Sequence, residues 1–229
     1  AEIGIDAIEH GFIHSYDHAE GKEVGVCNGS RNFRTDLDIE SPEVKAVHQK
    51  LIEAGTALTS TLAIFETQAR GVADDRSLAL LSPYYVDAYK SRRKRMNEQG
   101  EDWYFKKEWL KKSMAYDLAF YRAGGLLCAG PDPGLHNLPG FGDQKNYELF
   151  IEAGFKPEEA IQVMSSNAAT LLGREKLGQI KEGFYADLVL LDGDLEKDAR
   201  AIQKVRTVFR RGKAYDQEKL LAGLAGKVG

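Results

Sequence analysis

The segment that decides the fold is LLCAGPDPG at residues 126–134, where a short apolar run ends in glycine and is followed by an aspartate. Such a run is typical of a buried strand, and Asp132 lies just beyond its carboxyl end. A second segment of this kind, IEHG at residues 8–11, places His10 after an isoleucine-rich run. Because the carboxyl ends of parallel strands enclose a common site, we expect His10 and Asp132 to lie in one cavity.

The remaining pattern alternates strands and helices, which predicts a parallel α/β architecture. Buried strands are expected at residues 3–9, 56–65 and 126–130. Single helices are expected at 42–54, 143–153 and 157–172. Residues 74–123 are expected to form two or three helices, the last from about 109 to 123. Eight strands close a barrel of this type, so three strands predict a partial TIM-type (β/α) barrel that holds only the last strands.

After Gly173 the pattern changes to short strands at residues 177–180, 186–191, 205–210 and 213–215, followed by a short helix. We therefore predict two parts: a barrel segment over residues 1–173 and a small β appendage with a terminal helix over residues 174–229. The chain opens at Ala1 and at once enters an apolar stretch, so truncation or processing is expected.

Composition favours a globular protein without nucleic-acid or membrane partners. The chain has 229 residues, 43% of them hydrophobic, and a net charge of −4. Its basic residues cluster only at residues 90–95, with acidic residues close behind, and this pattern is better explained by a solvated helix face than by a nucleic-acid surface. No apolar run approaches the ~20 residues of a membrane span. The two cysteines, Cys27 and Cys128, favour a reducing compartment, and we expect a cytoplasmic protein.

The chemistry offered by His10 and Asp132 is that of a metal site. A neutral imidazole can ligate zinc, and a carboxylate can either ligate the metal or accept a proton from metal-bound water. By position alone, a structural histidine and an Asp-Pro-Gly turn remain alternatives. The chain has no Gly-x-Ser-x-Gly elbow, phosphate-binding glycine loop or His-Glu-x-x-His helix, which removes support for nucleophilic and nucleotide-dependent chemistry.

Three further histidines are candidates. His10, His14 and His18 have the four-residue spacing that would form one metal-binding helix face, but Gly11 favours a strand end followed by a polar loop. His136 lies in a glycine- and proline-rich loop after Asp132 and is a candidate substrate contact, with a solvated loop histidine as the alternative.

Several segments together carry a family resemblance, and they occur in the family's order over nearly the whole chain. They are IEHG at 8–11, TSTLA at 59–63, GPD at 130–132, ELFIEAGFKPEEA at 148–160, NAATLLG at 167–173, GQI at 178–180 and ADLV at 186–189. This set resembles the carboxyl-terminal half of the metal-dependent amidohydrolase superfamily, in its imidazolonepropionase and Xaa-Pro dipeptidase-like branch.

The resemblance implies a TIM-type barrel with a composite β-sandwich, and zinc or another divalent metal as cofactor, with one or two ions in the complete enzyme. His10 would match the family's sixth-strand metal ligand. Asp132 would match the eighth-strand aspartate, which binds metal and accepts the proton of the attacking water. The family's first-strand His-x-His pair, its bridging residue on the fourth strand and its fifth-strand histidine have no counterpart here, and Pro131 stands where a threonine usually precedes the aspartate.

These considerations predict a hydrolase of C–N bonds in an amide, cyclic amide or dipeptide-like substrate, incomplete and inactive as this chain alone. Its expected partners are a small amide or peptide-like substrate and either the missing amino-terminal half or further copies of itself. One alternative is a non-catalytic or partner-dependent half-barrel. Another is an inactive relative that keeps the fold and binds a small ligand.

Overall fold

The computed structural model describes residues 4–229 apart from residues 24, 27, 31, 71–73 and 135–136. Its strands are β1 (Ala7–Glu9), β2 (Ala57–Ser60), β3 (Leu127–Ala129), β4 (Leu188–Leu191), β5 (Val205–Arg210) and β6 (Lys213–Asp216). Its α-helices are α1 (Phe33–Asp36), α2 (Pro42–Glu53), α3 (Leu62–Ala69), α4 (Asp75–Leu80), α5 (Pro83–Gln99), α6 (Lys107–Arg122), α7 (Phe141–Ala153), α8 (Pro157–Met164), α9 (Ser166–Leu171) and α10 (Gln217–Leu224). The 3-10 turns are η1 (Gly11–His14), η2 (Tyr16–His18), η3 (Gly100–Asp102) and η4 (Ala199–Gln203).

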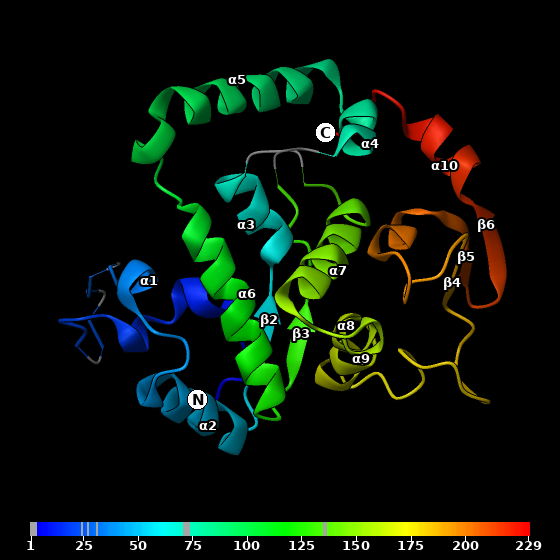
Figure 1. Ribbon diagram of the computed structural model, residues 1–229. Coiled ribbons are helices and arrows are strands. Elements are labelled where there is room, and N and C mark those ends of the chain that lie inside the picture. The colour runs from blue at the N-terminus through cyan, green and yellow to red at the C-terminus, as the bar shows by residue number, and fades with distance from the viewer. Residues whose placement is uncertain (1–3, 24, 27, 31, 71–73, 135–136) are drawn as a thin grey trace.

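A parallel sheet of order β1-β2-β3 forms the centre of the larger part, as the sequence predicts (Figure 1). Its register aligns Ile8, Leu58 and Leu127 across the three strands, and these side chains pack into the hydrophobic core. Alternation of side chains along each strand then puts the next row, Glu9 with Thr59 and Cys128, on the opposite face. Helices α6 and α7 pack against each other and against α3 around this sheet.

The first strand is shorter than predicted, because β1 covers only Ala7–Glu9 and residues 4–6 are not part of it. The predicted helix after it is confirmed: α2 begins at Pro42, and the Ser41 side chain accepts a hydrogen bond from the Val44 amide at 3.3 Å. The predicted strand 56–65 is wrong in its second half, since β2 ends at Ser60 and α3 begins at Leu62. The apolar run is buried in either conformation, so hydrophobicity alone could not separate them.

The long polar stretch contains helices α4, α5 and α6, as predicted, although the last begins at Lys107. Helix α6 is the last helix of the crossover between β2 and β3, and it buries Leu110, Met114 and Phe120 in the core. Helix α5, which carries the basic cluster, buries only Met96 and runs along the periphery of the fold (Figure 1). The basic cluster therefore lies on a mostly exposed helix.

The predicted helix 157–172 is broken in two at Ser165. The φ and ψ angles of Ser165, −129° and −80°, are not helical, and the Ser165 hydroxyl donates to the Ile161 carbonyl oxygen at 2.5 Å. Gly178 packs directly on this break, because a Cβ atom there would lie 2.7 Å from Ser166 Cα. Gly178 also has a φ of +77°, which favours glycine.

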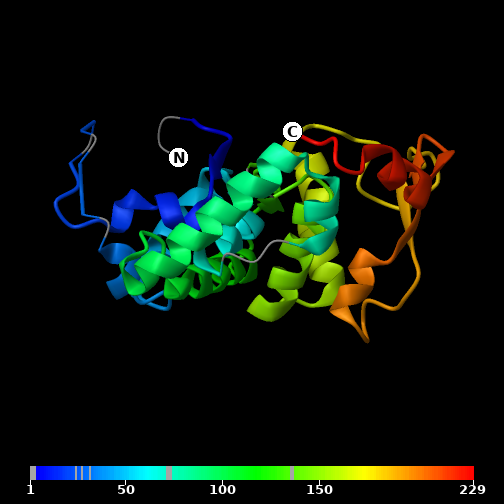
Figure 2. The same cartoon turned by 90° about the horizontal axis from the view of Figure 1, so that it is seen from above.

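The appendage is a small antiparallel sheet of order β4-β5-β6, followed by α10. It lies to one side of the main helical layer (Figure 2). The predicted strand 177–180 is wrong: residues 177–179 form bends, and Ile180 is 92% exposed. Across the residues with described positions, no helix has both the length and the apolar character needed to traverse a bilayer.

Candidate active site at the strand ends

His10 directly follows β1 and adopts a left-handed backbone conformation, with a φ of +69°. Its amide donates to the Thr59 carbonyl oxygen at 2.9 Å, which continues the sheet by one bond. Its ring Nδ1 lies 3.0 Å from the Thr61 hydroxyl, which comes from the end of the neighbouring strand. The backbone and the ring of His10 are thus both held by the segment that ends β2.

Asp132 lies beyond β3, also in a left-handed conformation, with a φ of +44°. The buried Asn137 holds this loop, since its side-chain amide donates to the Pro131 carbonyl oxygen and its backbone exchanges hydrogen bonds with Gly134. Gly142 is packed against the same Asn137 side chain, so closely that a Cβ atom would lie 2.4 Å from Oδ1. The sequence analysis missed Asn137, because a single polar residue in a Gly/Pro loop carries no periodic signal.

The structure brings the two predicted site residues together. His10 Nδ1 and Asp132 Oδ2 lie 3.9 Å apart, with side chains 27% and 47% exposed. His10 follows β1 and Asp132 lies beyond β3, the two outer strands of the parallel sheet, and both side chains reach solvent. Their proximity matches the expectation; their chemical roles stay a prediction.

Of the other candidate histidines, His14 lies beside His10, whereas His18 does not. His14 contacts the His10 ring edge-on, with 4.8 Å between ring centroids. His18 lies instead against Tyr116 of α6, 6.3 Å between centroids. His136, the candidate substrate contact, lies outside the described residues. Residues 11–14 form η1 and residues 16–18 form η2. The three histidines therefore do not share one face of a continuous α-helix.

A buried carboxyl group lies beneath the His10 turn. Asp117 of α6 is 2% exposed, and it accepts a hydrogen bond from the Ser60 hydroxyl at 2.5 Å. Burial raises the pKa of Asp117 to about 7. Gly11 packs on its Oδ1 atom, since a Cβ atom at Gly11 would lie only 3.0 Å away. Sequence reasoning missed this support because Asp117 stands inside an ordinary polar-apolar helix pattern.

Asn146 of α7 connects the ends of β2 and β3. It is fully buried; its Oδ1 accepts from the Ala63 amide at 2.7 Å and its Nδ2 donates to the Gly130 carbonyl oxygen at 2.8 Å. Ala63 lies two residues after Thr61, and Gly130 two residues before Asp132. Asn146 therefore fixes the two chain segments that carry the candidate site relative to each other.

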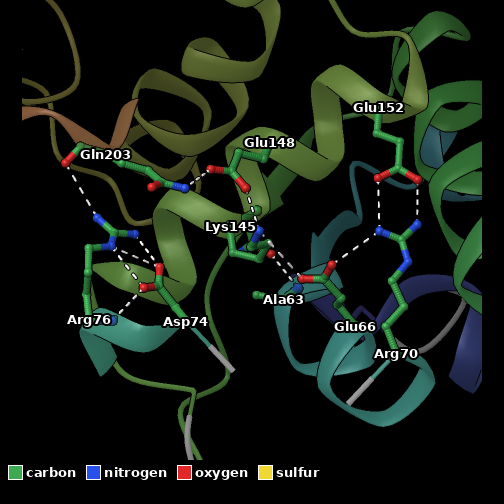
Figure 3. A network of polar contacts seen from close by, with 10 residues as sticks. Ala63, Glu66, Arg70, Asp74, Arg76, Lys145, Glu148, Glu152 and Gln203 are labelled. Carbon is green, nitrogen blue, oxygen red and sulfur yellow. Dashed lines mark hydrogen bonds and ion pairs between the residues drawn. The ribbon is translucent and has the colours of Figure 1, made fainter. Parts of the chain in front are cut away.

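A polar network links helices α3 and α7 to the appendage (Figure 3). Glu66 of α3 interacts with Arg70 and Lys145, and its burial raises its pKa despite these two cations. Lys145 and Gln203 both contact Glu148, and Gln203 belongs to η4 of the appendage. The network ties α7 to the appendage but does not include His10 or Asp132.

Two of the described site residues carry donor groups that metal ions bind. His10 and Asp132 supply an imidazole nitrogen and a carboxylate oxygen, both donors that zinc accepts. Within the described positions, no group of three or more His, Cys, Asp or Glu residues could hold a metal ion. A catalytic zinc site has three protein ligands, so the pair fits as a portion of such a centre and does not complete it.

Residues 144–215 match the sequence model of the amidohydrolase family. The predicted amidohydrolase resemblance is confirmed. The matched region runs from α7 into β6 and therefore includes the broken helix 157–172 and most of the appendage. No curated protein is similar enough to match the chain.

Several solved structures share the fold over the part that this chain covers. A Xaa-Pro dipeptidase with bound methionine in the active site has 21% identity and a TM-score of 0.57, with 94% of this chain and 41% of that chain covered. The A. niger ochratoxinase has 18% identity and a TM-score of 0.55, with 94% and 38% covered. A prolidase complexed with N-methylphosphonate-L-proline has 19% identity and a TM-score of 0.51, with 75% and 38% covered. The chain thus spans about two fifths of the length of these proteins.

Proposed function

We propose that this chain forms the carboxyl-terminal part of a metal-dependent amidohydrolase that cleaves C–N bonds in amide, cyclic amide or dipeptide-like substrates. In this proposal β1, β2 and β3 are the last strands of a TIM-type barrel, and β4-β5-β6 belongs to a composite β-sandwich. The observation that carries the proposal is the 3.9 Å approach of His10 and Asp132 at the ends of parallel strands. The family match supports the class of reaction.

The proposed roles follow from the donor groups. His10 offers a ring nitrogen to the metal while Thr61 orients the ring, as outer-shell partners of metal-ligating histidines do. The Asp132 carboxylate accepts the proton of the attacking water and passes it to the leaving nitrogen. A bound divalent metal ion would supply the Lewis acidity that makes water a nucleophile at neutral pH. The remaining ligands would come from a preceding segment or another chain, because the described residues offer two.

The substrate is proposed as a small amide or peptide-like molecule, in line with the dipeptidase and prolidase among the similar structures. His136 is kept as a proposed substrate contact, since it belongs to the loop between Asp132 and Asn137. Zinc is the proposed metal, and a cytoplasmic location, with neither nucleic acid nor membrane as partner, is proposed from composition.

The experiment is an assay of the complete reading frame that contains these residues, loaded with zinc, on Xaa-Pro dipeptides and N-acyl amino acids. Asp132→Asn keeps the shape of the side chain but cannot accept the proton, so turnover should fall ~10²–10⁴-fold. Asp87→Asn on the exposed face of α5 is the matched control and should retain full turnover. Near-normal turnover in Asp132→Asn would leave Asp132 with only a structural role in its turn.

A second candidate is a partner-dependent half-barrel without activity of its own. It is favoured by the sheet itself: among the described residues, β1 and β3 each pair with β2 only, so each has an outer edge without a neighbouring strand. Asn167 occupies part of the β3 edge, donating to the Leu127 carbonyl oxygen at 2.8 Å, whereas Ile5 beside β1 is 38% exposed. Unpaired edges favour association, so light scattering at micromolar concentration should report more than a monomer. A compact monomer would argue against this candidate.

A further inference from the structure

Two histidines away from the strand-end site share an unusual environment. His48 of α2 is 2% exposed, and its ring lies 4.3 Å from the Tyr116 ring and 5.4 Å from the Phe120 ring, measured between centroids. His18 of η2 approaches the same Tyr116 ring at 6.3 Å. The Nε2 atoms of both histidines are buried and make no hydrogen bond to any described residue. One aromatic ring of α6 therefore holds two imidazoles from two other elements.

This arrangement suits neutral imidazoles only. Protonation makes both ring nitrogens donors, and a buried Nε2–H without an acceptor carries the full desolvation penalty. It would also place two positive charges near each other around one ring. Burial lowers the pKa of His48 to about 4, with a further decrease from His18, and burial lowers the pKa of His18 as well.

The charged and titratable groups around the pair offset the lowering of the histidine pKa values only in part. Asp17 of η2 and Glu43 of α2 favour protonation of His18, but burial outweighs them. From α6, Tyr116 stays neutral because burial raises its pKa to about 12. Burial raises the pKa of Asp117, the next residue of α6, whereas it lowers the pKa of both histidines. Acid therefore favours the folded state through Asp117 and disfavours it through the histidines.

The pair is connected to the His10 turn. The Tyr116 hydroxyl and the Ser15 hydroxyl share a hydrogen bond of 3.1 Å, and Ser15 Oγ donates to the Gly11 carbonyl oxygen at 3.0 Å. Gly11 follows His10 directly. From α1, Arg34 donates to the Ile13 carbonyl oxygen at 2.6 Å and so adds a fixed cation to the same segment. Residues 11–18 are thus held by contacts that meet at Tyr116 and Arg34.

We propose that His18 and His48 form an acid-sensitive latch, which holds residues 11–18 on α2 and α6 while both imidazoles are neutral and releases them when the pair is protonated. Release breaks the Tyr116–Ser15–Gly11 connection and frees the turn that carries His10. The latch is a property of the folded chain and does not depend on hydrolytic activity.

The test is hydrogen–deuterium exchange of residues 11–18 at pH 7.5 and pH 5.0, expressed as protection factors, in wild type and in His48→Phe. The wild type should lose protection at pH 5.0, and the loss should be roughly 30-fold smaller in His48→Phe, the factor expected for a histidine shifted to a pKa of about 4. Asp117 is present in both proteins, so its opposing titration cancels in this comparison.

Three outcomes would overturn the latch. One is equal loss of protection in wild type and His48→Phe, and another is retained protection in the wild type at pH 5.0. The third is simultaneous loss in residues 57–60 of β2, which would mean global unfolding. If His48→Phe does not fold by circular dichroism at pH 7.5, His18→Gln and the imidazole NMR titration of the wild type decide. Ordinary titration of His48 near pH 6.5 with residues 11–18 still protected contradicts the latch.

Discussion

Asp117 leaves no room for a side chain at Gly11, although one residue lies in the middle of α6 and the other starts the turn after β1. A Cβ atom at Gly11 would lie 3.0 Å from Asp117 Oδ1, and the other carboxyl oxygen accepts the Ser60 hydrogen bond. A buried acid thus lies next to the chain segment that follows His10. Its protonation and its fit to glycine can each be tested.

Folding stability should depend on pH through Asp117. The pKa of Asp117 is raised from 3.8 to about 7 in the folded state, so its contribution is fully present below pH 3.8 and is lost as the pH rises towards 7. Between these limits the folding constant of the wild type should fall up to about tenfold per pH unit relative to Asp117→Asn. Urea denaturation of both proteins at pH 5.0 and 7.5 measures this. Parallel pH profiles would show that Asp117 ionises as readily folded as unfolded.

Gly11→Ala should destabilise the protein by about 1–2 kcal/mol, because φ is +45° at Gly11 and the added Cβ meets Asp117. The matched control is Gly223→Ala in α10, where a Cβ meets nothing within 4 Å and alanine favours the helix. The melting temperature should therefore fall in Gly11→Ala and rise in Gly223→Ala. A Gly11→Ala protein as stable as wild type would mean that the turn relaxes without strain.

Asn146→Ala should lower stability by about 1–3 kcal/mol for each polar group left without a partner, namely the Ala63 amide and the Gly130 carbonyl oxygen. Asn97→Ala on the exposed side of α5 is the control and should change stability little. Chemical denaturation monitored by tryptophan fluorescence gives both values. Equal stability of the two variants would show that water replaces the Asn146 side chain.

Zinc should bind the isolated chain weakly, because His10 and Asp132 are two ligands where a catalytic site uses three. Elemental analysis after dialysis against a chelator should find well below one zinc per chain, and His10→Ala should abolish the residual binding. Stoichiometric zinc that survives dialysis would point to ligands beyond this pair. Loss of that zinc in His14→Gln would then identify His14 as one of them.

The order of elements and the meeting of His10 with Asp132 were predictable, because both depend on apolar runs that end at glycine and on the geometry of parallel strands. The segment 56–65 was assigned entirely to a strand because it is rich in threonine and apolar residues. What ends β2 and starts α3 is a long-range contact, the Asn146 side chain at the Ala63 amide, which no local pattern contains.

The supports of the site were not predictable for a similar reason. Asp117, Asn137 and Asn146 are single polar residues whose partners come from other elements, so their sequence neighbours say nothing about them. The break at Ser165 was also missed, since the residues on both sides have good helical spacing.

Gly178 has a consequence for how this protein can be recombined. Gly178 packs closely on the backbone of Ser165 and Ser166. The chain that leads into the appendage therefore fits specifically against the junction of α8 and α9. Transplanting the appendage alone onto another scaffold would leave that junction without its match. The exchangeable module is therefore the stretch from α8 through β6, and chimaeras cut at Gly173 should assemble less well than chimaeras cut before Pro157.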